Sequence, residues 1–526
     1  MKKSICIILS ILMLCTTFTV LNLTVMANEL NTKQANSDEL VVYGNGNIIG
    51  NDPELDNSIL SSGSFGDDLQ WSLTVIGLLT ISGNGAMPDF EYSAPAPWNN
   101  YSFSIKEVVI ENGVTTIGTD AFNYCVNLTS ATIPNSVTTI GASAFNNCSA
   151  LKSITIPKSV IEIGTWAFGW CSALSNIAVE EGNPVFDSRD NCNAIIKTAT
   201  NSLVQGCKST IIPNSVSDIA EWAFHSCRGL TSITIPNGVT NISSSAFSGC
   251  IDLTNITLPN TLTSIGSTAF GDCTSLTSIT IPKSVTKISG SILTFCVNLS
   301  SIKVEEGNKV YDSRNNCNAI IETSTNSLIQ GCKSTVIPND IKSIGWDAFS
   351  GFNELTNITI PDGVTSIGGS AFRACRGITS ITIPDGVTKI EPFTFSDCGG
   401  LTNITLPNSI KHIAMEAFSQ CRSLTDVYYQ GTEEQWKAIT FDNPNCFGDA
   451  TIHFVGESSN LNSIGDVNLD GKINILDVTA IQKHLAQIIT LENNALALAD
   501  TNADDKINIL DATQIQKYLA HIIPEL

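Results

Sequence analysis

A 23-residue repeat fills the middle of the chain and decides what that part can fold into. Each unit contains a segment of the form Leu-x-x-Ile-x-Ile-Pro, as in residues 151–157 and 230–236. The prolines keep a spacing of 23 within two series: Pro213, Pro236, Pro259 and Pro282, then Pro338, Pro361, Pro384 and Pro407. A period of about 20–29 residues with this pattern indicates a leucine-rich solenoid, in which neighbouring coils bury the inward-pointing leucine and isoleucines. We count eleven coils between residues 111 and 425.

A second marker, an Ala-Phe pair followed three residues later by cysteine, recurs in the same phase. The phenylalanines are Phe122, Phe145, Phe168, Phe224, Phe247, Phe270, Phe349, Phe372 and Phe418, with Phe395 after a threonine. The cysteines are Cys125, Cys148, Cys171, Cys227, Cys250, Cys273, Cys296, Cys375, Cys398 and Cys421. A buried thiol that recurs in register is expected to be a packing residue. The pairs Cys192/Cys207 and Cys317/Cys332 are either bridged or free, because sequence does not give the Cα separation.

Two coils are longer than the rest. The distances from Pro157 to Pro213 and from Pro282 to Pro338 are both 56 residues, which is one regular coil plus 33. The two inserts match closely, for example over residues 179–196 and 304–321, and lie 125 residues apart. We infer that the array grew partly by duplication of a 125-residue block.

The full pattern Ile-Pro-x-x-Val-Thr-x-Ile-Gly-x-x-Ala-Phe-x-x-Cys resembles the BspA-type leucine-rich repeat family. Its members are surface and secreted proteins, and several act in adhesion. The resemblance implies a β-rich solenoid over residues 111–455, including a C-terminal cap with Trp436 and Cys446. Residues 61–110 are expected to form a β-rich N-terminal cap, because an open solenoid end exposes apolar surface and backbone edges.

The C-terminal sixty residues carry one calcium-loop pattern twice. The loops begin at Asp466 and Asp500, 34 residues apart, and each has oxygen-bearing side chains at positions 1, 3, 5, 9 and 12. Ca²⁺ takes six to eight oxygen ligands, and a tight loop supplies them from alternate residues. Each loop runs directly into a helical pattern. A small all-α module of two EF-hand-like loop-helix repeats is therefore expected over residues 465–526.

This pair of loops resembles a type I dockerin, a module that binds cohesin domains of a scaffold protein. The resemblance implies two Ca²⁺ ions, with Lys472 and Lys506 contributing backbone carbonyls. The implied side-chain ligands are Asp466, Asn468, Asp470, Asn474, Asp477, Asp500, Asn502, Asp504, Asn508 and Asp511. Asp505 replaces the usual glycine, which predicts a weaker second site.

The same resemblance places cohesin contacts at loop positions 10 and 11 and on the following helix. The residues are Ile475, Leu476, Gln482, Lys483, Ile509, Leu510, Gln516 and Lys517. Many dockerins carry Ser-Thr in the first pair, and the Ile-Leu here leaves the cohesin class open. The alternative is that Leu476 and Leu510 are core residues. Because the two halves nearly match, either face is a candidate for binding in a rotated pose.

The remaining segments indicate export. Residues 1–27 have a positive start, an apolar stretch and a small-residue cleavage site, as in a secretory signal peptide, with an uncleaved anchor as the alternative. Residues 28–60 are expected to form a mobile leader and residues 456–464 a linker. No other long apolar segment follows, so no membrane span is expected in the mature chain. A net charge of −22 argues against nucleic acid as a partner.

Candidate chemistry in the solenoid is sparse. Exposed strand positions form a threonine ladder that could bind glycan or protein, or could simply be good strand surface. Paired carboxylates across a cleft, as glycoside hydrolysis needs, are not found, and the five histidines are scattered. We therefore expect no enzyme but a secreted, extracellular adhesion protein. The dockerin resemblance implies that it belongs to a cellulosome-like complex, with an indirect role in polysaccharide breakdown. A dockerin-borne polysaccharide hydrolase is the alternative.

Overall fold

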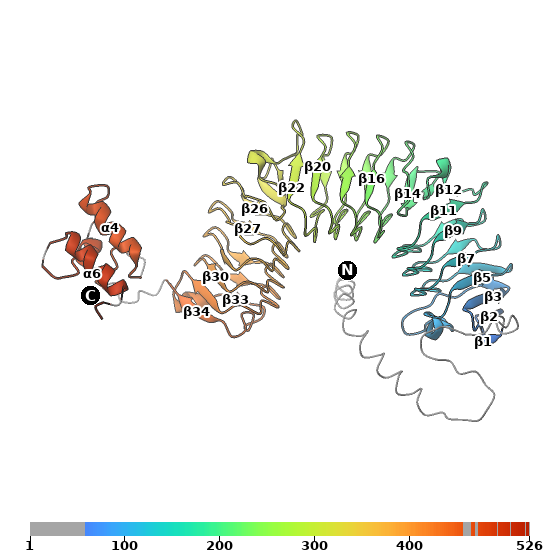
Figure 1. Cartoon of the computed structure of the whole chain (residues 1–526), viewed down its shortest axis with the longest axis horizontal. Coiled ribbons are helices and arrows are strands. Elements are labelled where there is room, and N and C mark those ends of the chain that lie inside the picture. Colours follow the sequence, from blue (N-terminus) through green and yellow to red (C-terminus); the bar gives the residue numbers. More distant parts are fainter. Residues whose placement is uncertain are drawn as a thin grey trace, which may run out of the picture. The chain divides into compact units, whose positions relative to one another are not determined.

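The computed structural model describes residues 58–455, 464–468, 472–491, 493–504, 506–520, 522–524 and 526. The predicted signal peptide lies outside the described residues, as do all but the last residues of the predicted leader and linker. Residues 58–455 form a solenoid whose successive coils lie side by side in sequence order (Figure 1). The fold predicted from the repeat, a β-rich leucine-rich-repeat solenoid with coils of about 23 residues, is confirmed.

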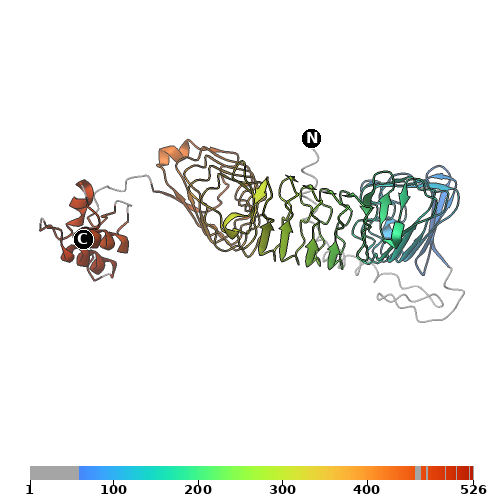
Figure 2. The same ribbon diagram turned by 90° about the horizontal axis from the view of Figure 1, so that it is seen from above.

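Each regular coil contributes two short strands, and these build two parallel ladders along the solenoid. Parallel pairing keeps the repeat in register, so that Ser232, Ile233 and Thr234 pair with the residues 23 positions later. Figure 2 shows the central strands lying side by side in this way. The isoleucines face the core while the threonines between them face solvent, which is the period-two alternation of a strand with one buried side.

The first ladder runs through the Leu-x-x-Ile-x-Ile-Pro segments. Its strands are β5 (Glu107–Ile110), β7 (Ser130–Thr132), β9 (Ser153–Ile156), β11 (Asn176–Val179), β16 (Ser232–Thr234), β18 (Asn255–Thr257), β20 (Ser278–Ile281), β22 (Ser301–Val304), β28 (Ser380–Thr382), β30 (Asn403–Leu406), β32 (Asp426–Tyr429) and β34 (Thr451–Phe454).

The second ladder precedes the Ala-Phe pair in the regular coils and also contains one strand from each insert, β14 and β25. Its strands are β4 (Gly85–Ala86), β6 (Val114–Ile117), β8 (Thr139–Ile140), β10 (Glu162–Ile163), β14 (Ser202–Gln205), β15 (Asp218–Ile219), β17 (Asn241–Ile242), β19 (Ser264–Ile265), β21 (Lys287–Ile288), β25 (Ser327–Gln330), β26 (Ser343–Ile344), β27 (Ser366–Ile367), β29 (Lys389–Ile390), β31 (His412–Ile413) and β33 (Thr440–Phe441).

Both ends of the solenoid carry additional elements. At the N-terminal end, β1 (Ile59–Phe65), β2 (Leu69–Thr74) and β3 (Leu78–Gly83) form an antiparallel meander that continues the first ladder through β5. A 3-10 turn, η1 (Asn99–Tyr101), follows the buried Trp98, whose ring stacks on Phe122. At the C-terminal end, α3 (Glu433–Lys437) places Trp436 against Tyr429, Phe441, Phe447 and Phe454.

The Ala-Phe turn, residues 118–125 and their equivalents, links the two ladders within a coil. Three backbone N–H groups of one turn donate to carbonyls of the next, as Asp120, Phe122 and Tyr124 do to residues 142, 144 and 146. The phenylalanines stack in three runs, one of which joins Phe349, Phe372 and Phe395 with nearly parallel rings 5.2 and 5.5 Å apart. The 23-residue spacing of the phenylalanines thus places their rings in columns inside the solenoid.

The cysteines do more than fill space. In eight turns the thiol donates a hydrogen bond to the carbonyl of the phenylalanine 26 residues earlier, as Cys148 does to Phe122 at 3.3 Å. The others are Cys171, Cys250, Cys273, Cys296, Cys375, Cys398 and Cys421. Burial raises the pKa of Cys171 and Cys250 to about 12, which leaves the thiols protonated and unreactive. All fifteen described cysteines are free thiols. The pairs Cys192/Cys207 and Cys317/Cys332 are therefore not bridged in this structure.

Each 33-residue insert folds into an antiparallel hairpin. The first contains β12 (Phe186–Asp187), the 3-10 turn η2 (Arg189–Asn191) and β13 (Ile195–Lys197), which pairs with β14. The second contains β23 (Tyr311–Asp312), η3 (Arg314–Asn316) and β24 (Ile320–Glu322), which pairs with β25. An ion pair fixes each turn, between Arg189 and Asp187 at 2.5 Å and between Arg314 and Asp312 at 2.7 Å.

Acidic residues at the start of each insert form hydrogen bonds to the neighbouring coil. The Glu180 carboxylate accepts a hydrogen bond from the Lys158 backbone at 3.0 Å, and Glu305 does the same for Lys283. The partners lie 22 residues apart, in neighbouring coils. Only the coil stacking brings them together, which is why residue type alone did not reveal the contact.

The chain leaves β14 and β25 without forming an Ala-Phe turn, so each insert creates a junction between two non-consecutive turns. The first junction joins residues 164–171 to 220–227, and the second joins 289–296 to 345–352. At the second, the buried Gln330 accepts hydrogen bonds from the backbone N–H of Ile292 at 3.1 Å and Leu293 at 3.0 Å, and from the Ser291 hydroxyl. Its amide donates to Gly331 and Ala348, both at 2.9 Å. Gln330 thus holds the two turns together.

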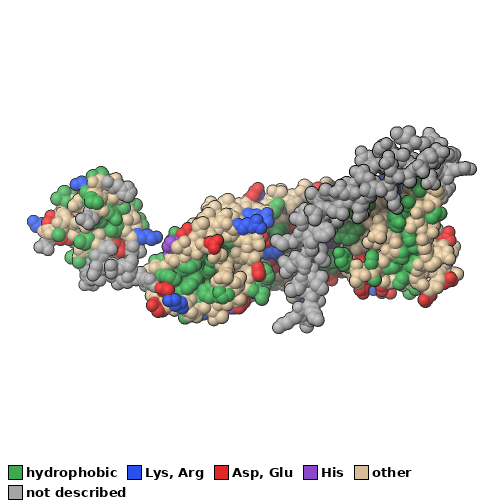
Figure 3. All heavy atoms as spheres, turned by 90° about the horizontal axis from the view of Figure 1, so that it is seen from below, with side chains coloured by type: hydrophobic (Ala, Val, Ile, Leu, Met, Phe, Trp, Pro, Cys, Tyr) green, Lys and Arg blue, Asp and Glu red, His purple; other side chains and the backbone are tan. Residues whose placement is uncertain are grey.

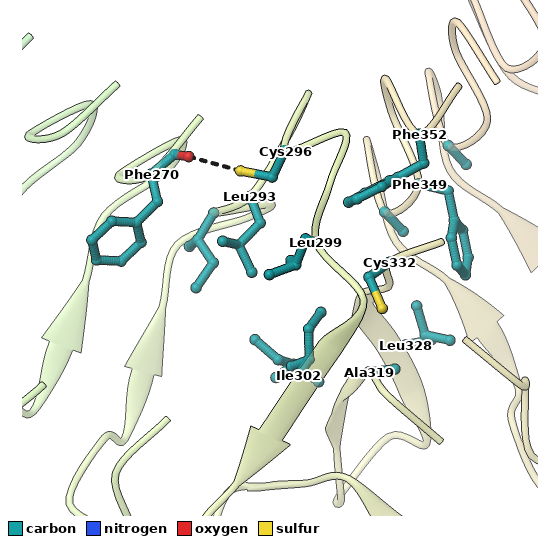
Figure 4. Close-up of a cluster of buried hydrophobic side chains, with 14 of the residues drawn as sticks. Phe270, Leu293, Cys296, Leu299, Ile302, Ala319, Leu328, Cys332, Phe349 and Phe352 are labelled. Atoms are coloured by element: carbon teal, nitrogen blue, oxygen red, sulfur yellow. Dashed lines mark hydrogen bonds between the residues drawn. The ribbon is translucent and has the colours of Figure 1, made fainter. Parts of the chain in front are cut away.

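Apolar side chains fill the second junction (Figure 4). Leu293, Leu299 and Ile302 from one coil meet Ala319, Leu328 and Cys332 from the insert and Phe349 and Phe352 from the next turn. Phe352 stands where other turns carry the cysteine, and its side chain is fully buried in this cluster. One hydrophobic core therefore runs unbroken through the second insert to the C-terminal end of the solenoid.

Asp347 lies at the second junction and gives the solenoid a pH-dependent stability. Burial raises the pKa of the Asp347 carboxyl to about 6, although Arg373 acts in the opposite direction. The unfolded chain releases this proton at about pH 4, so the free energy of unfolding falls as the pH rises from about 4 to about 6. We expect Asp347→Asn to raise stability near neutral pH by about 1 kcal/mol and to change it little at about pH 4. Urea unfolding of the full chain at both pH values measures this, and an equal gain at both would contradict it.

Candidate metal centre in the C-terminal module

The C-terminal module is built from three helices around a small core. The helices are α4 (Ile475–Leu485), α5 (Asn493–Ala499) and α6 (Ile509–Leu519). Val478 and Ile481 of α4 pack with Ala512 and Ile515 of α6 in a cluster that also holds Val467. The helical repeat places these residues on one face, which agrees with the predicted pair of loop-helix units. The fold predicted for this module, small and helical, is confirmed.

The last loop residues also begin each helix. The Asn474 side chain accepts a hydrogen bond from the Leu476 N–H at 2.8 Å, and the Asp477 carboxylate accepts one from the Asn474 N–H at 2.7 Å. Asn508 and Asp511 repeat this reciprocal arrangement at 2.8 Å in α6. It is the capping box, which satisfies backbone donors that a helix start leaves unpaired. Helix start and loop closure thus use the same side chains.

The aspartate at position 12 joins the two ends of its loop. Asp477 accepts a further hydrogen bond from the Asn468 N–H at 3.0 Å, and Asp511 accepts one from the Thr501 N–H at 3.0 Å. Both carboxylates are 0% exposed, and Asp466 is 8% exposed. A buried carboxylate is costly unless donors or a cation compensate its charge. The two loops therefore already hold buried negative charge at the predicted ligand positions.

The second loop also brings together oxygens from its first half. The Asp504 N–H donates to Asp500 Oδ1 at 3.1 Å and to Asn502 Oδ1 at 3.0 Å, so positions 1 and 3 converge on one nitrogen. The Lys506 N–H donates to Asp504 Oδ1 at 2.9 Å. Within the described part of the chain, no three His, Cys, Asp or Glu side chains are gathered tightly enough to hold a metal ion. Asp470 and Asp505 lie outside it.

The donor set fits a hard cation. The described candidates offer carboxylate, amide and backbone oxygens and neither imidazole nor thiolate, which suits Ca²⁺ and not Zn²⁺. In the second loop the side-chain oxygens accept hydrogen bonds from backbone N–H groups. Rotation about the side-chain bonds would turn these oxygens toward an ion. The backbone carbonyls of Lys472 and Lys506 belong to the ligand sets predicted for the first and the second Ca²⁺ ion.

The predicted partner-binding residues lie on the surface of the module. Ile475 and Leu476 are each 58% exposed, and Ile509 and Leu510 are 57% and 58% exposed. Gln482, Lys483, Gln516 and Lys517 are also exposed. Leu476 and Leu510 are therefore not core residues, so that alternative is wrong. Two similar apolar pairs, each followed by Gln-Lys, stand at equivalent places on α4 and α6.

The solenoid surface carries the predicted threonine ladder but no catalytic constellation in its described residues. Thr155, Thr234, Thr257, Thr280, Thr359 and Thr382 are exposed, and Thr405 is partly buried. In Figure 3 uncharged polar side chains and backbone cover much of the visible face, with charged side chains scattered among them. His412 pairs with Asp442 at 3.0 Å and His453 with Asp426 at 2.7 Å. Sequence reasoning missed these pairs because their partners lie 30 and 27 residues away.

Comparison with known proteins agrees with this division. The family described as BspA type leucine rich repeat region (6 copies) matches residues 99–197, 194–322 and 320–448. The type I dockerin domain matches residues 464–520. No curated protein matches the chain. Type I dockerin domains bind calcium and cohesins, and both kinds of domain are non-catalytic and typical of extracellular or cell-surface proteins.

Several solved structures are similar to this chain. A leucine rich cell surface protein from Faecalibacterium prausnitzii A2-165 is 27% identical, covers 73% of this chain and 98% of its own, and has a TM-score of 0.40. A leucine-rich repeat protein from Eubacterium ventriosum ATCC 27560 is 23% identical over 75% and 93% of the two chains, with a TM-score of 0.32. One from Bacteroides ovatus ATCC 8483 is 23% identical over 74% and 99%, with a TM-score of 0.33.

Among the described residues, no helix is both long and apolar enough to cross a membrane. The repeats, the solenoid that they build and the C-terminal loop-helix pairs lead to one assignment. The chain belongs to the BspA type leucine-rich repeat family and ends in a type I dockerin domain.

Proposed function

We propose that this protein is a secreted, non-catalytic adhesion component that docks through its dockerin onto a cohesin of a scaffold protein. The observation that carries the proposal is the presence of a dockerin and a long repeat solenoid on one chain. A dockerin supplies attachment, and the solenoid supplies an extended surface for a ligand. Attachment to a cellulosome-like complex would give the protein an indirect role in polysaccharide breakdown.

Two Ca²⁺ ions hold the dockerin loops in this proposal. The first is bound by Asp466, Asn468, Asp470, the Lys472 carbonyl, Asn474 and Asp477. The second is bound by Asp500, Asn502, Asp504, the Lys506 carbonyl, Asn508 and Asp511. The burial of Asp477 and Asp511 supports this assignment, because bound cations would compensate their charge.

The cohesin contacts proposed are Ile475, Leu476, Gln482 and Lys483 on one half, and Ile509, Leu510, Gln516 and Lys517 on the other. The exposure of all eight side chains supports a role at an interface. Because apolar residues at the centre of an interface contribute most of the binding energy, Ile475, Leu476, Ile509 and Leu510 are the expected anchors. The near-identity of the halves makes two rotated binding poses available.

Calorimetric titration of the mature protein against a panel of cohesins tests the proposal. We expect tight binding to one cohesin class with calcium and none with chelator. Leu476→Asp or Leu510→Asp alone should leave binding largely intact through the other half, and the double variant should weaken it by about a hundredfold or more. Ile488→Asp is a matched control, since this exposed residue follows α4 outside the proposed contacts.

Binding to no cohesin would contradict the proposal, and loss of binding in either single variant would contradict the two poses. The alternative, a polysaccharide hydrolase, is not favoured by any described residue cluster. Release of reducing sugar from plant polysaccharide by the purified chain would establish it instead.

A further inference from the structure

Three tryptophans and one histidine meet at the first junction of the solenoid. The ring centroids of Trp166 and Trp222 lie 5.0 Å apart and perpendicular, and Trp222 and His225 are also 5.0 Å apart at 89°. Trp166 lies nearly parallel to the His225 ring at 6.0 Å, and Trp170 meets its edge at 5.6 Å. Trp166 and Trp170 come from the turn before the insert, and the other two from the turn after it. We call these four residues the tryptophan cluster.

The repeat does not require bulky rings at these positions. The place of Trp166 and Trp222 is taken by Ser143, Ser245 and Ser370 in other turns, and the place of Trp170 by Asn147. All three tryptophans have positive φ, of 59°, 60° and 65° for Trp166, Trp170 and Trp222. Small polar residues tolerate that left-handed backbone better than large ones do. Because Ser143 and Asn147 have similar φ values of 54° and 60°, the repeat itself sets this backbone, and the tryptophans differ from other turns in their side chains.

The cluster leaves much of its aromatic surface in solvent. Trp166 is 40% exposed and Trp170 is 41% exposed. His225 is partly buried beneath them, its Nδ1 atom is enclosed without a hydrogen-bond partner, and burial lowers its pKa to about 4. The imidazole is therefore neutral near pH 7 and adds no positive charge to the cluster. The sequence signal for this cluster is tryptophan at two positions, 166 and 222, where other turns carry serine.

The second junction shows that closing such a gap does not need this cluster. There Gln330 bridges the turns, and the Phe295 N–H donates to the Ser350 carbonyl at 2.9 Å. At the first junction, the N–H groups of Phe168 and Trp170 donate no hydrogen bond within the described residues. The hydrophobic core also divides there into two clusters, whereas it continues through the second insert. The first junction thus differs from the second in its exposed indole faces.

The exposed indole faces match the chemistry of a sugar. One face of a pyranose ring presents C–H bonds of partial positive charge, which are attracted to the negative face of an indole. The net charge of −22 disfavours anionic polysaccharides, which selects a neutral one. A proline-rich peptide also binds aromatic surfaces, but it uses grooves between aligned rings, and Trp166 and Trp222 stand at 90° to each other.

We propose that the tryptophan cluster is a binding site for a neutral polysaccharide, with Trp166 and Trp170 as the stacking surfaces and Trp222 and His225 as their support. The inference rests on the proposed function only in taking the solenoid as the ligand-binding part of the protein. It gives the proposed adhesion a ligand class and a location, and it does not involve the threonine ladder.

Affinity electrophoresis of the full chain in gels containing barley β-glucan, xyloglucan or galactomannan tests this site. We expect at least one of these neutral polysaccharides to retard the protein. The double variant Trp166→Ser/Trp170→Asn uses residues that neighbouring turns already accommodate, and it should bind about tenfold or more weakly, as expected from the loss of stacking. Trp222→Ser is a second variant should the double variant misfold, which circular dichroism would show.

Trp346→Glu is the matched control, because Trp346 is 59% exposed and Glu221 fills its place at the first junction. The control should retain full retardation. The inference is overturned if no neutral polysaccharide retards the protein, if the double variant is retarded equally, or if only polygalacturonate does so. Quenching of tryptophan fluorescence by poly-L-proline alone would also overturn it, in favour of a peptide site. The unsubstituted chain and each variant are also titrated with cohesin. An unsubstituted chain that binds cohesin but no polysaccharide contradicts the proposed sugar site and leaves the proposed dockerin function intact.

Discussion

Calcium removal is expected to unfold the dockerin while the solenoid stays folded. Without the ions, Asp477 and Asp511 remain fully buried among backbone donors, and Asp500 and Asp504 add charge to the second loop. A ligand that binds only the folded form stabilises it by about 4 kcal/mol at about a thousand times its Kd. Among the described residues of the module, the core cluster holds eight buried apolar side chains. The stabilisation lost with calcium should therefore be larger than the free energy of unfolding that this small core provides by itself.

Far-UV circular dichroism of the full chain with calcium and with chelator measures this effect. The helical signal arises mainly from α4, α5 and α6, since the only α-helix described in the solenoid is the five-residue α3. The signal should fall in chelator and return with calcium. Asp477→Asn is expected to raise the calcium concentration at which the helical signal returns. If the first loop is the stronger site, this increase should be larger than the increase caused by Asp500→Asn. An unchanged spectrum in chelator would refute the dependence on calcium.

Phe372→Ala is expected to produce the largest loss of stability in the solenoid. Its ring is 0% exposed and lies between Phe349 and Phe395, with interplanar angles of 2° and 1°. Removing a buried phenylalanine side chain costs about 3–5 kcal/mol through lost burial and the cavity left behind. In a solenoid each coil is stabilised by its two neighbours, so one cavity weakens two interfaces. Urea unfolding followed by near-UV circular dichroism measures the change.

Phe393→Ser is the matched control for this substitution. Phe393 belongs to the next turn, is only partly buried, and occupies the position filled by Ser370 one coil earlier. Its φ of 59° also suits a small polar residue better than a large ring. We expect it to change the free energy of unfolding by less than about 1 kcal/mol. Equal losses in the two variants would show that the phenylalanine stack is not the source of the stability.

The position of the calcium loops and the period of the solenoid could be predicted from sequence because both depend on local spacing. Alternate oxygens in a twelve-residue loop, and isoleucines every second residue, define their structure wherever the chain places them. The thiol-carbonyl hydrogen bonds could not be predicted in the same way. The spacing marked Cys148 as a core residue, but its bond to the Phe122 carbonyl depends on how two turns stack.

Sequence by itself determined the repeat, the inward-facing residues, the two inserts and the dockerin, because each follows from a period or a local pattern. Tertiary structure alone decided how the inserts are closed. The second junction is held by the hydrogen bonds of Gln330 to the turn before the insert, whereas the first brings together Trp166, Trp170, Trp222 and His225, although Gln205 takes the place of Gln330 there. The Gln330 hydrogen bonds join residues 37 and 38 positions apart, and the ring contacts between the two turns join residues more than fifty positions apart. Both cross a coil without an Ala-Phe turn, and no spacing rule within one coil describes them.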